Sequence, residues 1–198
     1  MLKKLMNKRE LAALIFLMSA TFACYGDDPI DREDHVLSDG KLDITEVGAV
    51  VATAQNHLKM LTKAAVEGAQ KELEEAAIFR PMAFMLMKSS GEVKKMKLGE
   101  KGENAPSDIK VVLYRAGLKS LARHGEIHAA AIAYPGTLEK GGETVRIMAV
   151  EHEHRLGVSG IKLIPIIQED GKARFGQPMS QEKPFLIFYD GKEKGDQS

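Results

Sequence analysis

The chain has 198 residues, enough for a domain with a substantial core, and it carries 28 basic and 28 acidic side chains. It contains no tryptophan, only 6% aromatic residues and no basic stripe. These features argue against a stacking surface for nucleic-acid bases and against phosphate binding. We therefore expect a globular protein that binds no nucleic acid.

The first 23 residues have the pattern of a secretory signal. The segment MLKKLMNKRE carries four basic residues and one acidic residue, and the apolar run LAALIFLMSATFA that follows is too short to span a bilayer comfortably. Cleavage after residue 23 leaves 24 basic and 27 acidic side chains, a net charge of −3. The sequence thus predicts an exported, mildly acidic domain, either periplasmic or anchored to a membrane.

Cys24, the one cysteine of the chain, directly follows this predicted signal, and two interpretations stay open. The segment resembles the lipobox of bacterial lipoproteins, in which a cysteine after a small residue becomes lipidated. Thr21 departs from that pattern, because an aliphatic residue usually stands there. Alternatively, an ordinary signal peptidase cuts after Ala23. With either cleavage no intramolecular disulfide can form, so stability must come from the core.

The composition divides the remaining chain into three parts. Residues 24–42 are polar and acidic, with proline and glycine, and this composition indicates a tether. Residues 43–190 predict a single α+β domain, and residues 191–198 predict a flexible tail.

The domain is predicted to open with a long helix. Asp43 and Glu46 form a capping box, apolar residues recur with helical spacing between positions 47 and 73, and Pro81 ends the pattern. One unbroken helix of about 35 residues would be longer than a small sheet needs and could pair with a second copy as a homodimer. The alternative is a helix broken at Gly68, with both pieces packed on the sheet.

A β-hairpin, a second helix and a run of strands are predicted to follow. The hairpin is PMAFMLMK with VKKMKL, and the later strands are EIHAAAIAYPG, ETVRIMAVEHEHR and GVSGIKLIPIIQE, with ARFGQ and KPFLIFYD as weaker candidates. The second helix begins at Ser107 and ends before Gly125, and its predicted apolar face consists of Ile109, Val112, Leu113, Ala116 and Leu121. The segregated order predicts an α+β fold: an antiparallel sheet of about five strands with two main helices, in the order α-β-β-α-β-β-β.

This order of elements resembles small single-sheet sensor folds of the profilin-like, PAS-like and roadblock-like kinds. The segments FRPMAFMLMKSSGEV, GLKSLARHGEIHAAAIAYPG and AVEHEHRLG also resemble uncharacterised small bacterial proteins over residues 44–170. That resemblance implies no established activity and no catalytic residues, and a fold alone does not define a function.

The stretch VEHEHRLG contains the residues that most suggest a site. His152 and His154 share one face of the predicted strand, with Glu151 and Glu153 on the other. With His128 from the preceding strand, the two histidines could bind zinc or another transition metal. The alternative is a strand that becomes polar as it leaves the core, with its glutamates and histidines pairing across strands at the sheet surface.

Other motifs are weaker. DGKLDITE resembles the second half of an EF-hand loop, but His35 and Leu37 stand where oxygen ligands are required. Met82, Met85 and Met87 suit Cu(I) as soft ligands, or else fill the core. The chain has no nucleophile elbow, P-loop or dinucleotide fingerprint.

We therefore expect an exported domain that binds a small ligand or a protein partner, without catalytic or cofactor-binding residues. The alternative is a metal-dependent enzyme or metal carrier that uses His128, His152 and His154.

Overall fold

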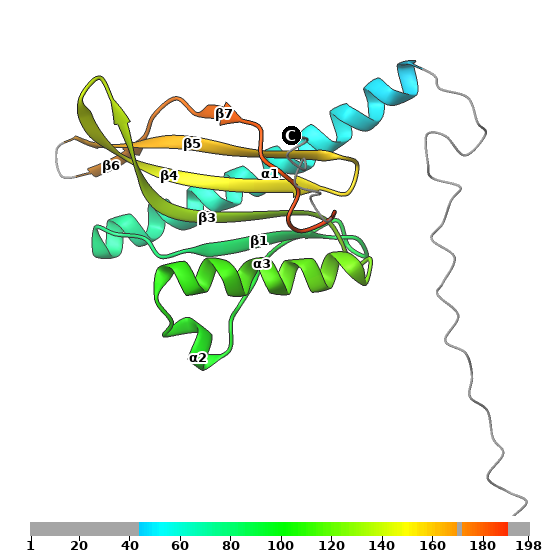
Figure 1. Cartoon of the computed structure of the whole chain (residues 1–198), viewed down its shortest axis with the longest axis horizontal. Helices are drawn as coiled ribbons and strands as arrows, with labels where there is room; N and C mark the ends of the chain where they lie inside the picture. Colours follow the sequence, from blue (N-terminus) through cyan, green and yellow to red (C-terminus); the bar gives the residue numbers. More distant parts are fainter. Residues whose placement is uncertain (1–43, 170–171, 190–198) are drawn as a thin grey trace, which may run out of the picture. The chain divides into compact units, whose positions relative to one another are not determined.

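The computed structural model describes residues 44–169 and 172–189. They form an α+β fold in which one curled antiparallel sheet carries helices on both faces (Figure 1). The helices are α1 (Ile44–Ala76), α2 (Glu100–Glu103) and α3 (Ser107–Arg123). The strands are β1 (Met82–Met87), β2 (Val93–Lys95), β3 (Ile127–Lys140), β4 (Glu143–His154), β5 (Val158–Glu169), β6 (Lys172–Phe175) and β7 (Met179–Gln181).

Several predictions concern residues outside these ranges. The signal segment 1–23, the tether 24–42 with Cys24, most of the EF-hand-like loop and the tail 191–198 all lie there. Within the described residues, none of the helices combines the length and the apolar character needed to cross a membrane.

The sheet contains seven strands in the order β2-β1-β3-β4-β5-β6, and β7 pairs with β5 on the edge that also carries β6. Every pair of neighbours is antiparallel, which confirms the predicted fold class. The predicted count of about five strands is too low, because β6 was only a weaker candidate, within ARFGQ, and β7 was not predicted. The short helix α2 was not predicted either. KPFLIFYD is not a strand: residues 183–189 are irregular, and a buried carboxylate binds three of their backbone N–H groups.

Helix α1 is continuous through Gly68, so the predicted break is absent. A Cβ atom at this position would lie 2.9 Å from Sδ of Met82 and 3.3 Å from Cζ of Phe84, so the glycine lets the helix approach the sheet closely. No described side chain before Ala54 is buried, and Figure 1 shows this end of α1 projecting beyond the sheet.

The two faces of the sheet have separate cores. On the face that α1 covers, called here the α1 face, Leu58 and Leu61 pack against alanines and larger apolar side chains of β1, β3, β4 and β5. On the opposite face, called here the α3 face, Tyr114 and Leu118 of α3 pack on β1 and β3 with Ile187. Met82 belongs to the α1 face while Met85 and Met87 pack on the α3 face, where they fill the core.

The predicted apolar face of the second helix is confirmed only at Leu121, which packs against the core of the α3 face, whereas its other four residues are exposed. Ile109, Val112 and Leu113 are exposed, Val112 by 56%, whereas Tyr114 and Leu118 are buried. Lys110 is buried as well, because its ammonium group reaches the carboxylate of Glu103 at 3.7 Å while its aliphatic stem packs inside. The side of this helix with more apolar residues is therefore not the side that packs against the sheet.

Candidate functional site

The end of β4 carries four consecutive buried polar side chains. Glu151 and Glu153 point to the α3 face, while His152 and His154 point to the α1 face, as predicted. None of the four is more than 7% exposed. The alternative of a solvated strand end is therefore wrong, because α1 covers one face here and residues 183–189, called here the C-terminal strap, cover the other.

The carboxylate of Glu153 anchors the C-terminal strap. Its side chain is fully buried, and one oxygen accepts hydrogen bonds from Nζ of Lys183 at 3.1 Å and from the backbone N–H of Leu186 at 2.7 Å. The other oxygen accepts from the backbone N–H groups of Ile187 at 2.8 Å and Phe188 at 3.1 Å. All four donors belong to the strap, so this carboxylate fixes it to the sheet and has no open position for a substrate.

Glu151 occupies a second closed network on the same face. Arg115 of α3 donates to both of its oxygens at 3.1 and 3.0 Å, and the hydroxyl of Tyr134 donates at 2.8 Å. Nζ of Lys183 lies 3.4 Å away. Burial alone would raise the pKa of Glu151, but Lys183, Tyr134 and Arg115 together hold it below its usual value. The charged form is therefore retained, as a link between α3, the sheet and the strap.

On the α1 face, His154 forms a hydrogen bond with a histidine that the sequence had not singled out. Nδ1 of His57, on α1, lies 3.0 Å from Nε2 of His154. The backbone N–H of Leu156 donates to Nδ1 of His154 at 3.0 Å. Because Nδ1 of His154 is an acceptor, the proton of this neutral ring is on Nε2, which donates to His57.

His128 joins this pair from β3. In the pairing of β1 with β3, Leu86 lies opposite Ala129 and Met87 opposite Ile127, so His128 is the extra residue of a β-bulge. Its ring stacks on that of His57, with centroids 6.0 Å apart, and the rings of His57 and His154 are 5.2 Å apart. The bulge therefore brings His128 to the α1 face.

His152 lies apart from this stack. Its ring packs over Gly160, where a Cβ atom would lie 3.2 Å from Nε2, and Lys162 lies on the same face of the neighbouring strand. The structure thus groups His128 and His154 with His57 rather than with His152.

A metal on Nε2 of His154 would displace the proton that this ring donates, whereas metal-bound histidines normally donate from their other nitrogen. Among residues 44–169 and 172–189, no group of three or more His, Cys, Asp or Glu side chains is arranged to hold a metal.

The buried histidines favour their neutral forms. Burial, with help from the positive Lys162, lowers the pKa of His152 to about 4. Burial, followed by His57, His128 and Arg155, lowers the pKa of His154 to about 4. The pKa of His128 is also lowered, by burial and then by Arg155. Each of these rings is therefore uncharged at neutral pH.

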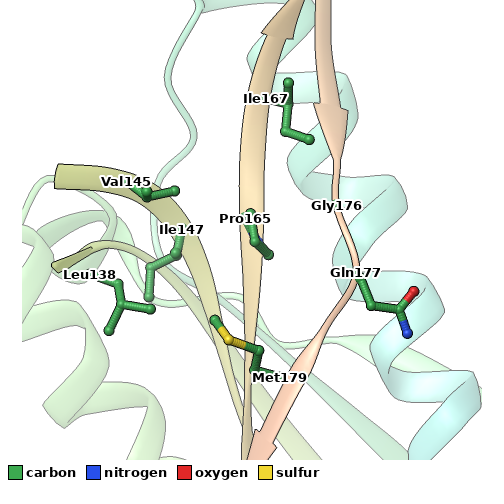
Figure 2. A pocket seen from close by; sticks show the side chains of 8 residues that line it. All are labelled: Leu138, Val145, Ile147, Pro165, Ile167, Gly176, Gln177 and Met179. Atoms are coloured by element: carbon green, nitrogen blue, oxygen red, sulfur yellow. The ribbon is translucent and has the colours of Figure 1, made fainter. Parts of the chain in front are cut away.

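The α3 face also carries an apolar groove away from these polar networks. The groove has a volume of about 380 Å³, and apolar side chains of β3, β4, β5 and β7 line most of it (Figure 2). Its lining residues are Leu138, Val145, Ile147, Pro165, Ile167, Gly176, Gln177 and Met179. Helix α3 packs against β1 and β3, so it leaves this part of the face uncovered.

Local chain geometry explains the wall of the groove. The backbone N–H of Gly176 donates to the carbonyl of Pro165 at 2.8 Å, and a Cβ atom at position 176 would lie 3.3 Å from that of Pro165. The glycine thus lets the chain between β6 and β7 run close beside β5. Ile147 and Met179 form the floor with the neighbouring apolar cluster, and Ile167 remains 43% exposed at the rim.

Comparisons of the chain with models of known protein families, with curated proteins and with solved structures give no match. Three places in the described residues can indicate a function: the apolar groove, the closed glutamate networks and the histidine stack.

Proposed function

We propose that this chain is an exported, non-catalytic binding domain that holds a small apolar ligand in the groove on its α3 face. The observation that carries the proposal is the groove of about 380 Å³, because ligand sites are usually concave, mostly apolar and about 300–1,000 Å³ in volume. Its one polar lining side chain, Gln177, offers an amide rather than a charge.

The two buried glutamates of the α3 face support binding over chemistry. A catalytic acid or base needs access to a substrate proton. The carboxylates of Glu151 and Glu153 are instead surrounded by Arg115, Tyr134, Lys183 and the strap, which use them as structural acceptors.

The ligand site is tested with a neutral fluorescent probe such as N-phenylnaphthylamine. Ile167→Glu is expected to weaken saturable probe binding at least about tenfold, because it places a charge at the apolar rim. The matched control Val112→Glu adds the same charge at an exposed position of α3 and should bind like wild type. Equal binding by both variants would place the probe elsewhere, and a wild-type protein without saturable binding would overturn the proposal.

The proposal of export rests on residues 1–23, and membrane anchoring rests on Cys24. We expect cells fed labelled palmitate to label the wild-type chain but not Cys24→Ser, because the thiol is the acylation site of a bacterial lipoprotein. The control Lys41→Arg keeps both the charge at position 41 and the cysteine, so it should be labelled like the wild type. Unlabelled wild-type protein in the exported fraction would instead indicate cleavage after Ala23 by an ordinary signal peptidase.

A further inference from the structure

We propose that His57, His128 and His154 form an acid-sensitive clasp that holds α1 against the end of the sheet at neutral pH and releases it on acidification. The clasp joins three elements, α1, β3 and β4, through the hydrogen bond of 3.0 Å between His57 and His154 and the stack of the His128 ring on that of His57. It lies on the α1 face, opposite the groove, so it does not depend on the function proposed above.

The hydrogen bonds of His154 leave no position for an added proton. Its Nε2–H donates to Nδ1 of His57, and its Nδ1 accepts the backbone N–H of Leu156. A proton added to Nδ1 of His154 would face that backbone proton. Protonation of His154 therefore breaks a hydrogen bond that the neutral clasp makes.

The surroundings of the clasp also oppose positive charge. The groups whose charge acts on the rings are the three histidines themselves, Lys88 of the β1–β2 turn and Arg155 of the β4–β5 turn. Farther along the same face lie His152 of β4 and Lys162 of β5, with Lys59 of α1 near Lys162. Glu153 is next to His154 in β4 but points to the opposite face, where the strap neutralises it. Arg155 lies close to His128, with 3.5 Å between NH1 and Nδ1. Protonated rings would thus add to an already positive cluster.

Release would start at the projecting end of α1. Residues 44–53 have no buried side chain among those described, so Ala54 and Leu58, on either side of the clasp residue His57, are the first side chains of this helix to be buried. Farther along, Gln70 still bonds the carbonyl of Ala173 at 3.1 Å and Leu73 stays in the core. Opening at the clasp can therefore occur while the second half of α1 remains attached.

Amide hydrogen exchange of the full chain, in buffer containing a chelator, tests the clasp. Between pH 7.5 and pH 5, and after correction for intrinsic exchange, opening of residues 54–61 should rise about tenfold or more, because the opened histidines bind protons that the closed ones exclude. At pH 5, residues 54–61 should still open at a lower free energy than helix α3 and residues 65–73, whose core amides need global unfolding. An equal free energy of opening in all three segments would overturn the proposal, since it would indicate global unfolding.

Variants assign the response to these rings. The double variant His57→Asn/His154→Gln retains a side-chain acceptor and donor near the original positions but cannot titrate, so its response should fall to about threefold or less. If it does not fold, Arg155→Met provides the second measurement: removing that charge should also reduce the response. The control His124→Gln changes an exposed histidine directly after α3, whose ring bonds the carbonyl of Ser120, and should respond like wild type. A full wild-type response in either test variant would overturn the proposal.

Discussion

Replacement of Glu153 by glutamine is expected to destabilise the protein by about 3–5 kcal/mol, the usual cost of breaking a buried charge pair by removing one partner. The new amide nitrogen would face backbone N–H groups that now donate to a carboxylate, and Lys183 would lose the nearer of its two anionic partners. Chemical denaturation at neutral pH measures the loss.

Two further variants sharpen this prediction. Adding Lys183→Met to Glu153→Gln should recover part of the stability. It removes the ammonium group of Lys183, which has lost the negative charge of Glu153 beside it. The control Glu139→Gln alters an exposed glutamate that accepts a hydrogen bond from the hydroxyl of Thr144, and it should change stability by no more than about 0.5 kcal/mol. A Glu153→Gln protein as stable as the control would show that the carboxylate does not anchor the strap.

Acidification from pH 7 to pH 5 is expected to lower the free energy of unfolding by about 4 kcal/mol, about 2 kcal/mol each from His152 and His154. Both pKa values are lowered to about 4 in the fold from 6.5, so below pH 6.5 the unfolded chain binds more protons and stability falls until about pH 4. The lowered pKa of His128 acts in the same direction. Glu151 adds a further loss of stability below about pH 4.5, because its pKa in the fold is lower than this ordinary value and the unfolded chain is protonated first.

The variant His152→Leu separates the two contributions. It removes a buried titratable ring next to Lys162 and should lose about 2 kcal/mol less than wild type over the same pH range. Urea unfolding at pH 7 and pH 5 provides the comparison, with His124→Gln as the exposed control. An unchanged pH dependence in His152→Leu would mean that this ring is not held neutral by the fold.

Periodicity in the sequence predicted much of the fold. The helical spacing of α1, the hairpin after Pro81 and the antiparallel strands near the C-terminus are local patterns, and the alternation from Glu151 to His154 correctly separated the two faces. Local pattern failed for α3 because Tyr114 and Leu118 pack inside while the more numerous apolar residues lie outside. Amphipathicity thus located this helix but not its buried side.

The site depends on long-range contacts that no local pattern shows. His57 is 97 positions from His154, and the donors to Glu153 are 30 to 35 positions away. A signal for His57 did exist: it lies one helical turn from Ala54 and Leu61, next to the apolar stripe of α1. The position of His128 depended on a bulge, which the sequence of alanines around it did not reveal.

Photolabelling with an aliphatic diazirine probe tests whether the groove on the α3 face is the binding site. We predict saturable labelling of peptides that contain Leu138, Ile167 or Met179, suppressed by excess unlabelled aliphatic ligand and by Ile167→Glu. The exposed apolar stripe of α3 is the internal comparison. Labelling centred on Ile109 and Val112, or spread evenly without saturation, would contradict the account.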